Sequence, residues 1–257
     1  MSLENYDVLL VDLDGVVWLE GEPIQENVSV LRNMLDKGKE VYIVTNNSTR
    51  SRRTYSYLLS RIGLDVDESH IITSSYSSAL YLRKIEGRGV PVLPVGEAGL
   101  VEELVLQNHI VLTMSEWIHA KYVVVGLDRK VNYEHISAAV RAVLRGAKLI
   151  ATNTDELLPT STGPKVGAGG VVGLIEKSTG IRVSIVTGKP SPILASIIKE
   201  KIGTKLEKSV FVGDKVSTDG EQARLLGVPA LIVSRSHLEN KSDYDRITFV
   251  ESLAKAL

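Results

Sequence analysis

The sequence predicts an α/β protein with a doubly wound, mostly parallel sheet and a second, smaller α/β domain inserted into it. Two observations favour this fold class. Short apolar runs alternate with helix-like stretches along the 257 residues, which is the pattern of βαβ units. Four polar motifs directly follow apolar runs in the outer parts of the chain, and none lies in the middle, where the alternation continues. Insertion of the middle part into an outer domain is the simplest interpretation.

The first part of the core domain is expected at residues 1–77. The apolar run at 8–11 predicts a strand that is buried on both faces. Glycines after the helix-like stretches mark their ends, because glycine readily adopts the left-handed conformation of a helix C-cap. The elements expected here are a strand at 8–11, a helix at 28–36, a strand at 41–44, a helix that is capped by Thr49 or Ser51 and runs to about Ile62, and a short strand at 71–72.

The inserted domain is expected at residues 78–182. Its own strands and helices alternate, with strands at 92–95, 122–125 and 148–151 and helices at 98–107, 135–144 and 171–177. The glycine-rich stretch at 167–170 lacks the spacing and the preceding strand of a dinucleotide-binding loop. We interpret it as a turn into the helix at 171–177.

The second part of the core domain is expected at residues 183–257. Ser191 and Pro192 predict a helix start, since serine caps helices and proline suits the first helical turn. The elements expected here are strands at 183–186, 210–212, 230–233 and 247–250, and helices at 193–202 and 222–226.

The four polar motifs all follow expected strands. They are Asp12-Leu13-Asp14-Gly15, Thr45-Asn46-Asn47, Gly188-Lys189-Pro190, and Gly213-Asp214 followed by Asp219. In an open parallel sheet, ligands bind in the crevice beyond the carboxyl ends of the strands. The motifs are therefore expected to share one site.

These residue types suit phosphoryl transfer. Alternating strand geometry turns Asp12 and Asp14 the same way, and four neighbouring carboxylates oppose joint ionisation unless a cation such as Mg²⁺ is bound. Asp12, nearer the strand, is the candidate nucleophile, and Asp14 is the candidate general acid and base. Lys189 offers positive charge, and Thr45 and Asn46 offer hydrogen bonds to phosphate oxygens.

Together, these motifs in this order resemble the haloacid dehalogenase superfamily, and within it the NagD-like and 4-nitrophenyl-phosphatase-like branch with a large cap. The stretches at 123–128 and 151–155 in the insert resemble the cap of that branch. The resemblance covers nearly the whole chain. It implies a Rossmann-like core, a cap that closes over the site, and hydrolysis of a small phosphomonoester through an aspartyl-phosphate.

The resemblance also implies a role for each motif residue. Asp12 and Asp14 would be catalytic, and Thr45, Asn46, Asn47 and Lys189 would hold the phosphate. Asp12, Asp214 and the backbone carbonyl of Asp14 would bind Mg²⁺. Asp219 would support the site from behind or pair with Lys189, although a helix N-cap role is equally compatible with its position. The cap segment at 153–159 would face the leaving group.

Composition excludes several other functions. There is no cysteine, so disulfides and thiolate catalysis are excluded. The 30 basic and 31 acidic residues are balanced, which gives no footprint for nucleic acid and no polybasic membrane anchor. The N-terminus lacks the pattern of a signal peptide, and no apolar run is long enough to span a membrane. A cytoplasmic protein with a small phosphorylated metabolite as partner is expected, and the insert is a candidate interface of a homo-oligomer.

Two alternatives stay open. A phosphotransferase or phosphomutase would use the same aspartyl-phosphate but pass the phosphoryl group to a hydroxyl of the substrate. A non-catalytic protein that binds a phosphorylated metabolite would need the phosphate-binding residues alone. Trp18, just after the aspartate pair, is compatible either with the entrance of the site or with packing under the cap.

Overall fold

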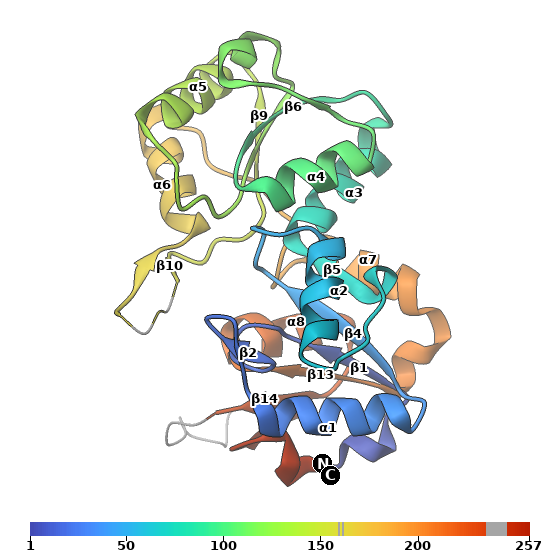
Figure 1. Cartoon of the computed structure of the whole chain (residues 1–257). Coiled ribbons are helices and arrows are strands. Elements are labelled where there is room, and N and C mark those ends of the chain that lie inside the picture. Colours follow the sequence, from blue (N-terminus) through green and yellow to red (C-terminus); the bar gives the residue numbers. More distant parts are fainter. Residues whose placement is uncertain (159, 161, 235–245) are drawn as a thin grey trace. The chain divides into compact units, whose positions relative to one another are not determined.

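The computed structural model describes residues 1–158, 160, 162–234 and 246–257 of the chain. The chain divides into two compact units (Figure 1). The first consists of residues 1–45, 53–72 and 189–257, and the second of residues 46–52 and 73–188.

A six-stranded sheet forms the centre of the first unit. Its strand order is β15-β14-β13-β1-β4-β5, so that the first strand of the chain lies in the middle. Strand β1 is parallel to both of its neighbours, and β14 is parallel to β13 and β15. The strand bounds are β1 Val8–Val11, β4 Glu40–Thr45, β5 Ile71–Thr73, β13 Ser209–Gly213, β14 Ala230–Val233 and β15 Ile247–Val250.

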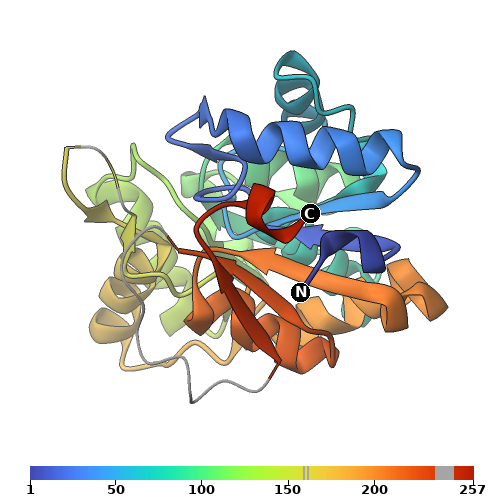
Figure 2. The same cartoon turned by 90° about the horizontal axis from the view of Figure 1, so that it is seen from below.

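Helices lie on both faces of this sheet. In Figure 2, the blue helix α1 lies on one side of the strands and the orange helices α7 and α8 lie on the other. Apolar residues of α1 and α2 pack with those of β1, β4, β13 and β14 in one buried cluster. The helix bounds are α1 Gln25–Asp36, α2 Arg52–Arg61, α7 Pro192–Ile202 and α8 Glu221–Leu226. This is the doubly wound arrangement that the alternating pattern predicts.

Short elements complete the first unit. A small antiparallel hairpin follows β1, and a π-helix connects β13 to α8. Their bounds are β2 Trp18–Leu19, β3 Glu22–Pro23 and π-helix η5 Val216–Gly220, with 3₁₀ turns η1 Leu3–Asn5, η2 Glu68–His70, η4 Gly203–Lys208 and η7 Leu253–Ala256.

A second, five-stranded sheet forms the centre of the other unit. Its order is β12-β9-β8-β6-β7, and all of its neighbouring strands are parallel. The strands are β6 Pro91–Val95, β7 Ile110–Val111, β8 Tyr122–Val125, β9 Lys148–Ala151 and β12 Ile185–Val186, and a separate hairpin is formed by β10 Leu157–Leu158 and β11 Lys165–Val166. The helices are α3 Ser74–Glu86, α4 Ala98–Leu106, α5 Tyr133–Leu144, α6 Ala168–Thr179 and the 3₁₀ helix η3 Met114–His119.

The predicted fold class is confirmed: a parallel core sheet is accompanied by a separate α/β cap with its own parallel sheet. The expected strand at 183–186 differs in its place. We counted it with the core, but Ile185 and Val186 pair with Ile150 and Ala151 of β9 in the five-stranded sheet. Two short apolar runs look alike in sequence, and only pairing decides which sheet a strand joins. The domain boundaries at residues 78 and 182 stay a prediction.

Within the described parts of the chain, no helix combines the length and the apolar character needed to cross a membrane.

Candidate active site

The carboxyl end of β1 places Asp12 next to β13. The Asp12 amide donates a hydrogen bond to the Val212 carbonyl at 2.8 Å, so the parallel pairing continues one residue beyond the strand. The Asp12 residue is only 7% exposed. The first acidic motif therefore lies beside the Gly213-Asp214 motif, as expected from strands that end at one edge of a sheet.

Lys189 forms ion pairs with two of the aspartates. Its Nζ lies 2.6 Å from Asp12 Oδ1 and 2.7 Å from Asp219 Oδ1. The lysine precedes Ser191, whose Oγ accepts hydrogen bonds from the first amides of α7, so the cap that we predicted for this helix is present. All three charged side chains are almost fully buried. Burial alone would lower the pKa of the Lys189 ammonium, but the carboxylates of Asp12 and Asp219 outweigh this effect and raise it.

Asp219 also organises the loop after β13. Its Oδ2 accepts hydrogen bonds from the amides of Asp214 and Lys215, both at 3.1 Å. A Cβ on Gly213 would lie 2.2 Å from the Asp219 side chain, so glycine is required for this close approach. Asp219 lies within the π-helix η5, and Gly220 occupies the N-cap of α8. Asp219 is thus not the N-cap of α8, and it pairs with Lys189 instead.

Asp12, Asp214 and Asp219 form one acidic cluster. Each contributes a carboxylate oxygen to a group in which all lie within 4.8 Å of one another. Burial raises the pKa of Asp12 well above its ordinary value; Lys189 opposes this, and the other two carboxylates add to it. Burial and then the Asp219 carboxylate raise the pKa of Asp214 to about 6.

This donor set fits a hard divalent cation. Three carboxylates face one ammonium group, so negative charge exceeds positive charge inside a largely buried cluster. Burial first, and then the neighbouring carboxylates, oppose ionisation of Asp12 and Asp214 and raise their pKa values. Carboxylate oxygens are the ligands of Mg²⁺ in proteins. A bound divalent cation would balance the cluster without any change of its residues.

Gly15 is required by the same cluster. Its φ of +93° lies in the left-handed region that side chains avoid, and a Cβ there would lie 2.4 Å from Asp214 Oδ2. The glycine that follows Asp14 therefore serves the turn and the approach of Asp214 together.

Asp14 forms a hydrogen bond with an aromatic side chain, and this contact was not predicted from the sequence. The Trp18 indole Nε1 donates a hydrogen bond to Asp14 Oδ1 at 2.9 Å. Trp18 is 4% exposed and packs in the apolar cluster with Tyr55, with ring centroids 6.1 Å apart. The two residues lie on either side of the turn at residues 15–17, with Trp18 at the start of β2, and this turn was not predicted from the sequence.

The Thr45-Asn46-Asn47 motif is divided between the two units. Thr45 is the buried last residue of β4, whereas Asn46 begins the segment that belongs to the second unit. Asn46 Nδ2 donates to Asp155 Oδ2 at 3.1 Å. Asn47 Oδ1 accepts from the Thr49 amide and hydroxyl, at 3.2 and 2.7 Å. In the first unit, the structure thus gathers Asp12, Lys189, Asp214 and Asp219, and the contacts of Asn46 and Asn47 just described lie within the second.

Comparison with known proteins agrees with this geometry. A family model of haloacid dehalogenase-like hydrolases matches residues 9–108, and a second HAD-hydrolase-like model matches residues 186–256. The chain is 30% identical to the sugar-phosphatase AraL of Bacillus subtilis, over 88% of this chain and 82% of that protein. It is 31% identical to a dihydroxyacetone phosphatase of Corynebacterium glutamicum, over 93% and 85% of the two chains.

The chain belongs to the haloacid dehalogenase-like hydrolase family.

Among solved structures, the p-nitrophenyl phosphatase from Archaeoglobus fulgidus superposes on this hydrolase with a TM-score of 0.88 and 32% sequence identity, over 98% of this chain and 100% of that one. The resemblance to the NagD and p-nitrophenyl phosphatase branch with its large cap is confirmed. The first family model covers Asp12, Asp14 and Thr45, and the second covers Lys189, Asp214 and Asp219.

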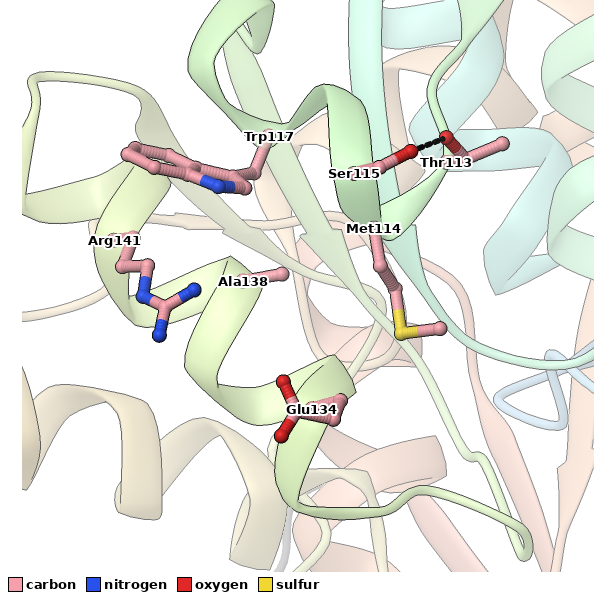
Figure 3. Close-up of a pocket in the computed structure, with 7 residues that line it drawn as sticks. All are labelled: Thr113, Met114, Ser115, Trp117, Glu134, Ala138 and Arg141. Atoms are coloured by element: carbon pink, nitrogen blue, oxygen red, sulfur yellow. Dashed lines mark hydrogen bonds between the residues drawn. The ribbon is translucent and has the colours of Figure 1, made fainter.

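The second unit of this hydrolase also carries a pocket of about 400 Å³ between η3 and α5 (Figure 3). Figure 3 shows the Trp117 indole and the Arg141 guanidinium on one side of it, with Met114 and Glu134 further along. The full lining is Thr113, Met114, Ser115, Trp117, Glu134, Ala138 and Arg141. None of the residues that the sequence predicts for substrate lines this pocket.

Proposed function

We propose that this chain is a Mg²⁺-dependent phosphatase that hydrolyses a small phosphomonoester through an aspartyl-phosphate on Asp12. The observation that carries the proposal is the buried cluster in which Lys189 bridges Asp12 and Asp219 beside Asp214. Such a cluster is costly for stability alone, because buried charges lose their hydration. It is well suited to an anionic group that transfers between oxygens.

The relatives support the substrate class. Those compared above are named for sugar phosphates and for dihydroxyacetone phosphate, and the similar structure is named for p-nitrophenyl phosphate. All of these are phosphomonoesters of small molecules. We therefore assign the same class to this chain and leave the identity of the alcohol to experiment.

The cation would be held by the Asp12 and Asp214 carboxylates together with the backbone carbonyl of Asp14. When bound, Mg²⁺ supplies positive charge next to the phosphoryl oxygens and offsets the repulsion between the carboxylates. Asp219 then remains paired with Lys189. Its carboxylate already accepts hydrogen bonds from the lysine and from two backbone amides.

Asp12 performs the first chemical step. One oxygen of its carboxylate attacks phosphorus, and the bond between phosphorus and the ester oxygen breaks. Asp14 donates a proton to the departing oxygen, so that the alcohol leaves neutral. Trp18 fixes the Asp14 carboxyl through the indole hydrogen bond, which is 2.9 Å long. The products of this step are the alcohol and an acyl phosphate on Asp12.

Water completes the reaction. Asp14, now ionised, takes a proton from a water molecule that attacks the same phosphorus, and the bond to Asp12 breaks. Inorganic phosphate leaves, and both aspartates return to their initial states. Lys189 stabilises the charge on the phosphoryl oxygens throughout. Thr45, Asn46 and Asn47 donate hydrogen bonds to the same oxygens and keep the phosphoryl group in line.

The test is release of inorganic phosphate from p-nitrophenyl phosphate and from a panel of small phosphate esters, with Mg²⁺ and with EDTA. Asp12→Asn removes the nucleophile and keeps the shape of the side chain, so we expect it to abolish release from every ester. The matched control is Asp65→Asn, which changes an exposed aspartate of the same unit and should leave the rate unchanged.

Turnover in ¹⁸O-labelled water separates hydrolysis from transfer, because only hydrolysis places the label in inorganic phosphate. Wild-type activity in Asp12→Asn would refute the assignment of the nucleophile. Transfer to a hydroxyl without label in phosphate would identify a phosphotransferase, and binding of esters without any turnover would identify a binding protein.

A further inference from the structure

The segment that follows β4 belongs to the second unit and forms several hydrogen bonds with other residues of that unit. The Asn46 carbonyl accepts from Ser74 Oγ at 2.7 Å and from Asn153 Nδ2 at 3.0 Å. The Ser48 carbonyl accepts from Ser75 Oγ at 2.9 Å. The backbone around Asn46 is thus fixed by residues from α3 and from the loop after β9.

The Asn46 side chain is fixed by the same loop. Its Nδ2 donates to Asp155 Oδ2 at 3.1 Å, across 109 positions of the sequence. Asn153 connects the two residues a second time, because its Oδ1 accepts from the Asp155 amide at 3.1 Å while its Nδ2 holds the Asn46 carbonyl. Asn153 is 4% exposed. Asn46, Asn153 and Asp155 therefore form one closed polar network within the second unit.

The glycine-rich stretch at the start of α6 donates backbone hydrogen bonds to Asp155 and Glu156. The Gly169 amide donates to the Asp155 carbonyl at 2.9 Å, and the Gly167 amide donates to the Glu156 carbonyl at 2.8 Å. A Cβ on Gly167 would lie 2.2 Å from the Asp155 carbonyl oxygen, and one on Gly169 would lie 2.3 Å from that of Thr154. The stretch thus packs closely against this loop and donates hydrogen bonds to it, in addition to forming a turn.

We propose that Asp155 is a positioning residue for phosphate recognition: it orients the Asn46 carboxamide toward the phosphate of the substrate. The inference rests on the proposed function, in which Asn46 donates to a phosphate oxygen. A carboxylate only accepts hydrogen bonds, so it decides which end of the carboxamide turns toward it. The amide nitrogen carries two hydrogens: Asp155 accepts one of them, and in the proposed substrate complex the other donates to a phosphate oxygen.

The consequence is that phosphate binding and recognition of the leaving group would be coupled. Asp155 belongs to the loop that, by resemblance, faces the leaving group, and Asn46 directly follows the phosphate-binding Thr45 in the chain. A change in the loop after β9 would reach the phosphate-binding side chain through a single hydrogen bond. Residues of this loop would then influence the affinity for phosphate as well as the choice of alcohol.

The experiment is a double-mutant cycle with Asn46→Ala and Asp155→Ala, with KM and kcat measured on p-nitrophenyl phosphate. We expect Asp155→Ala to raise KM about tenfold with little change in kcat, which is the size of one charge-assisted hydrogen bond. In the Asn46→Ala background, Asp155→Ala should have no further effect. Asp155→Asn, which still offers an acceptor oxygen, should restore most of the wild-type KM.

The control is Glu116→Ala. Glu116 is an exposed carboxylate of the same unit that accepts two hydrogen bonds from Thr113, and its removal should leave KM unchanged. Thermal unfolding of each variant shows whether the fold persists. A merely structural role of Asp155 would lower kcat and the melting temperature alike, and with the same size in both Asn46 backgrounds, which would overturn the proposal.

Binding of inorganic phosphate, measured by calorimetry, gives the same comparison without turnover. Weaker binding in Asp155→Ala, absent in the Asn46→Ala background, supports the positioning role even if Asp12 proves not to be the nucleophile. Unchanged phosphate binding and unchanged KM in Asp155→Ala would refute it while leaving the phosphatase activity established.

Discussion

Lys189 is a charged residue whose burial costs stability. An ammonium buried with two carboxylates loses its hydration, and apolar replacements of such groups are often neutral or stabilising. Removal of only one partner is costly, by about 3–5 kcal/mol for a buried pair. The contacts of Lys189 with Asp12 and Asp219 are therefore weak evidence for a role in stability. The proposed function gives them a purpose, since a phosphoryl group needs positive charge beside it.

His109 is a buried histidine outside the candidate site. It is 6% exposed, and its Nε2 lies 2.9 Å from the Ala79 carbonyl, which makes Nε2 the protonated nitrogen. Nδ1 is buried and has no hydrogen-bond partner among the described residues. Burial lowers the pKa of His109 below its ordinary value of 6.5, and the nearby Arg83 adds to this, against the hydrogen bond to Ala79.

We predict that His109 makes the protein less stable in mild acid. The unfolded chain binds a proton at higher pH than the folded chain, so stability from this group is present above pH 6.5 and is lost as the pH falls below it. His109→Gln does not titrate and retains a donor for the Ala79 carbonyl. Melting temperatures measured from pH 8 to pH 5 should therefore fall more steeply in the wild type than in the variant. Parallel curves would show that His109 carries no such effect.

At the scale of elements, α3 was not predicted from the sequence, and its serines explain why. Ser74, Ser75, Ser77 and Ser78 look like a loop, since serine competes with the helix for backbone hydrogen bonds. All four are buried, and their hydroxyls bond to groups from other segments, including the Thr187 carbonyl at 2.7 Å from Ser77 Oγ. Tertiary partners thus turned a weak helix sequence into a helix.

Two of the three glycines in helix α6, Gly169 and Gly173, have opposite surroundings. Gly169 faces the Thr154 carbonyl, which a Cβ would approach to 2.3 Å, whereas nothing lies within 4 Å of a Cβ on Gly173. Both lie inside the helix. The pair therefore separates the intrinsic preference of a helix for alanine from the cost of a steric clash.

We predict opposite effects for alanine at these two positions. Gly173→Ala should stabilise the protein by up to about 1 kcal/mol, because alanine is the better helix former. Gly169→Ala should destabilise it by roughly 1–3 kcal/mol, the usual cost of overpacking. Urea unfolding of both variants measures the difference. Stabilisation by Gly169→Ala would show that the backbone at residues 154–155 gives way without cost.

At the scale of the whole molecule, the acidic cluster and the polar network of Asp155 are built from residues of different units. The acidic cluster is built from β1, β13 and the residues that follow them, all in the six-stranded unit. The polar network of Asp155 lies in the five-stranded unit. Binding of a metal should therefore affect the two sheets differently.

We predict that Mg²⁺ stabilises the EDTA-treated protein mainly through the six-stranded sheet. A ligand at about 100 times its Kd contributes about 2.7 kcal/mol to a folded state that alone binds it. Hydrogen exchange should slow in β1 and β13 more than in β6 and β8, and the melting temperature should rise. Asp214→Asn should lose both effects, whereas Asp65→Asn should retain them. Protection by Mg²⁺ that persists in Asp214→Asn, or that is as large in β6 and β8 as in β1 and β13 of the wild type, would contradict this location of the metal.

The sequence by itself determined the fold class, the family and the residues of the acidic cluster. Apolar runs that end in polar motifs are local patterns, and the parallel pairing of β1 with β13 brings Asp12 and Asp214 together at one edge. Lys189 and Asp219 were named from the chemistry and the order of the motifs, because the strand before Lys189 lies in the other sheet and Asp219 lies in a π-helix. Only the tertiary structure decided which sheet the strand at Ile185 and Val186 joins, that Trp18 holds Asp14, and that Asp155 holds Asn46. The last two contacts join residues across a turn and across 109 positions, and the strand pairs with residues 35 positions earlier in the chain, so neither the helical nor the strand period carries information about any of them.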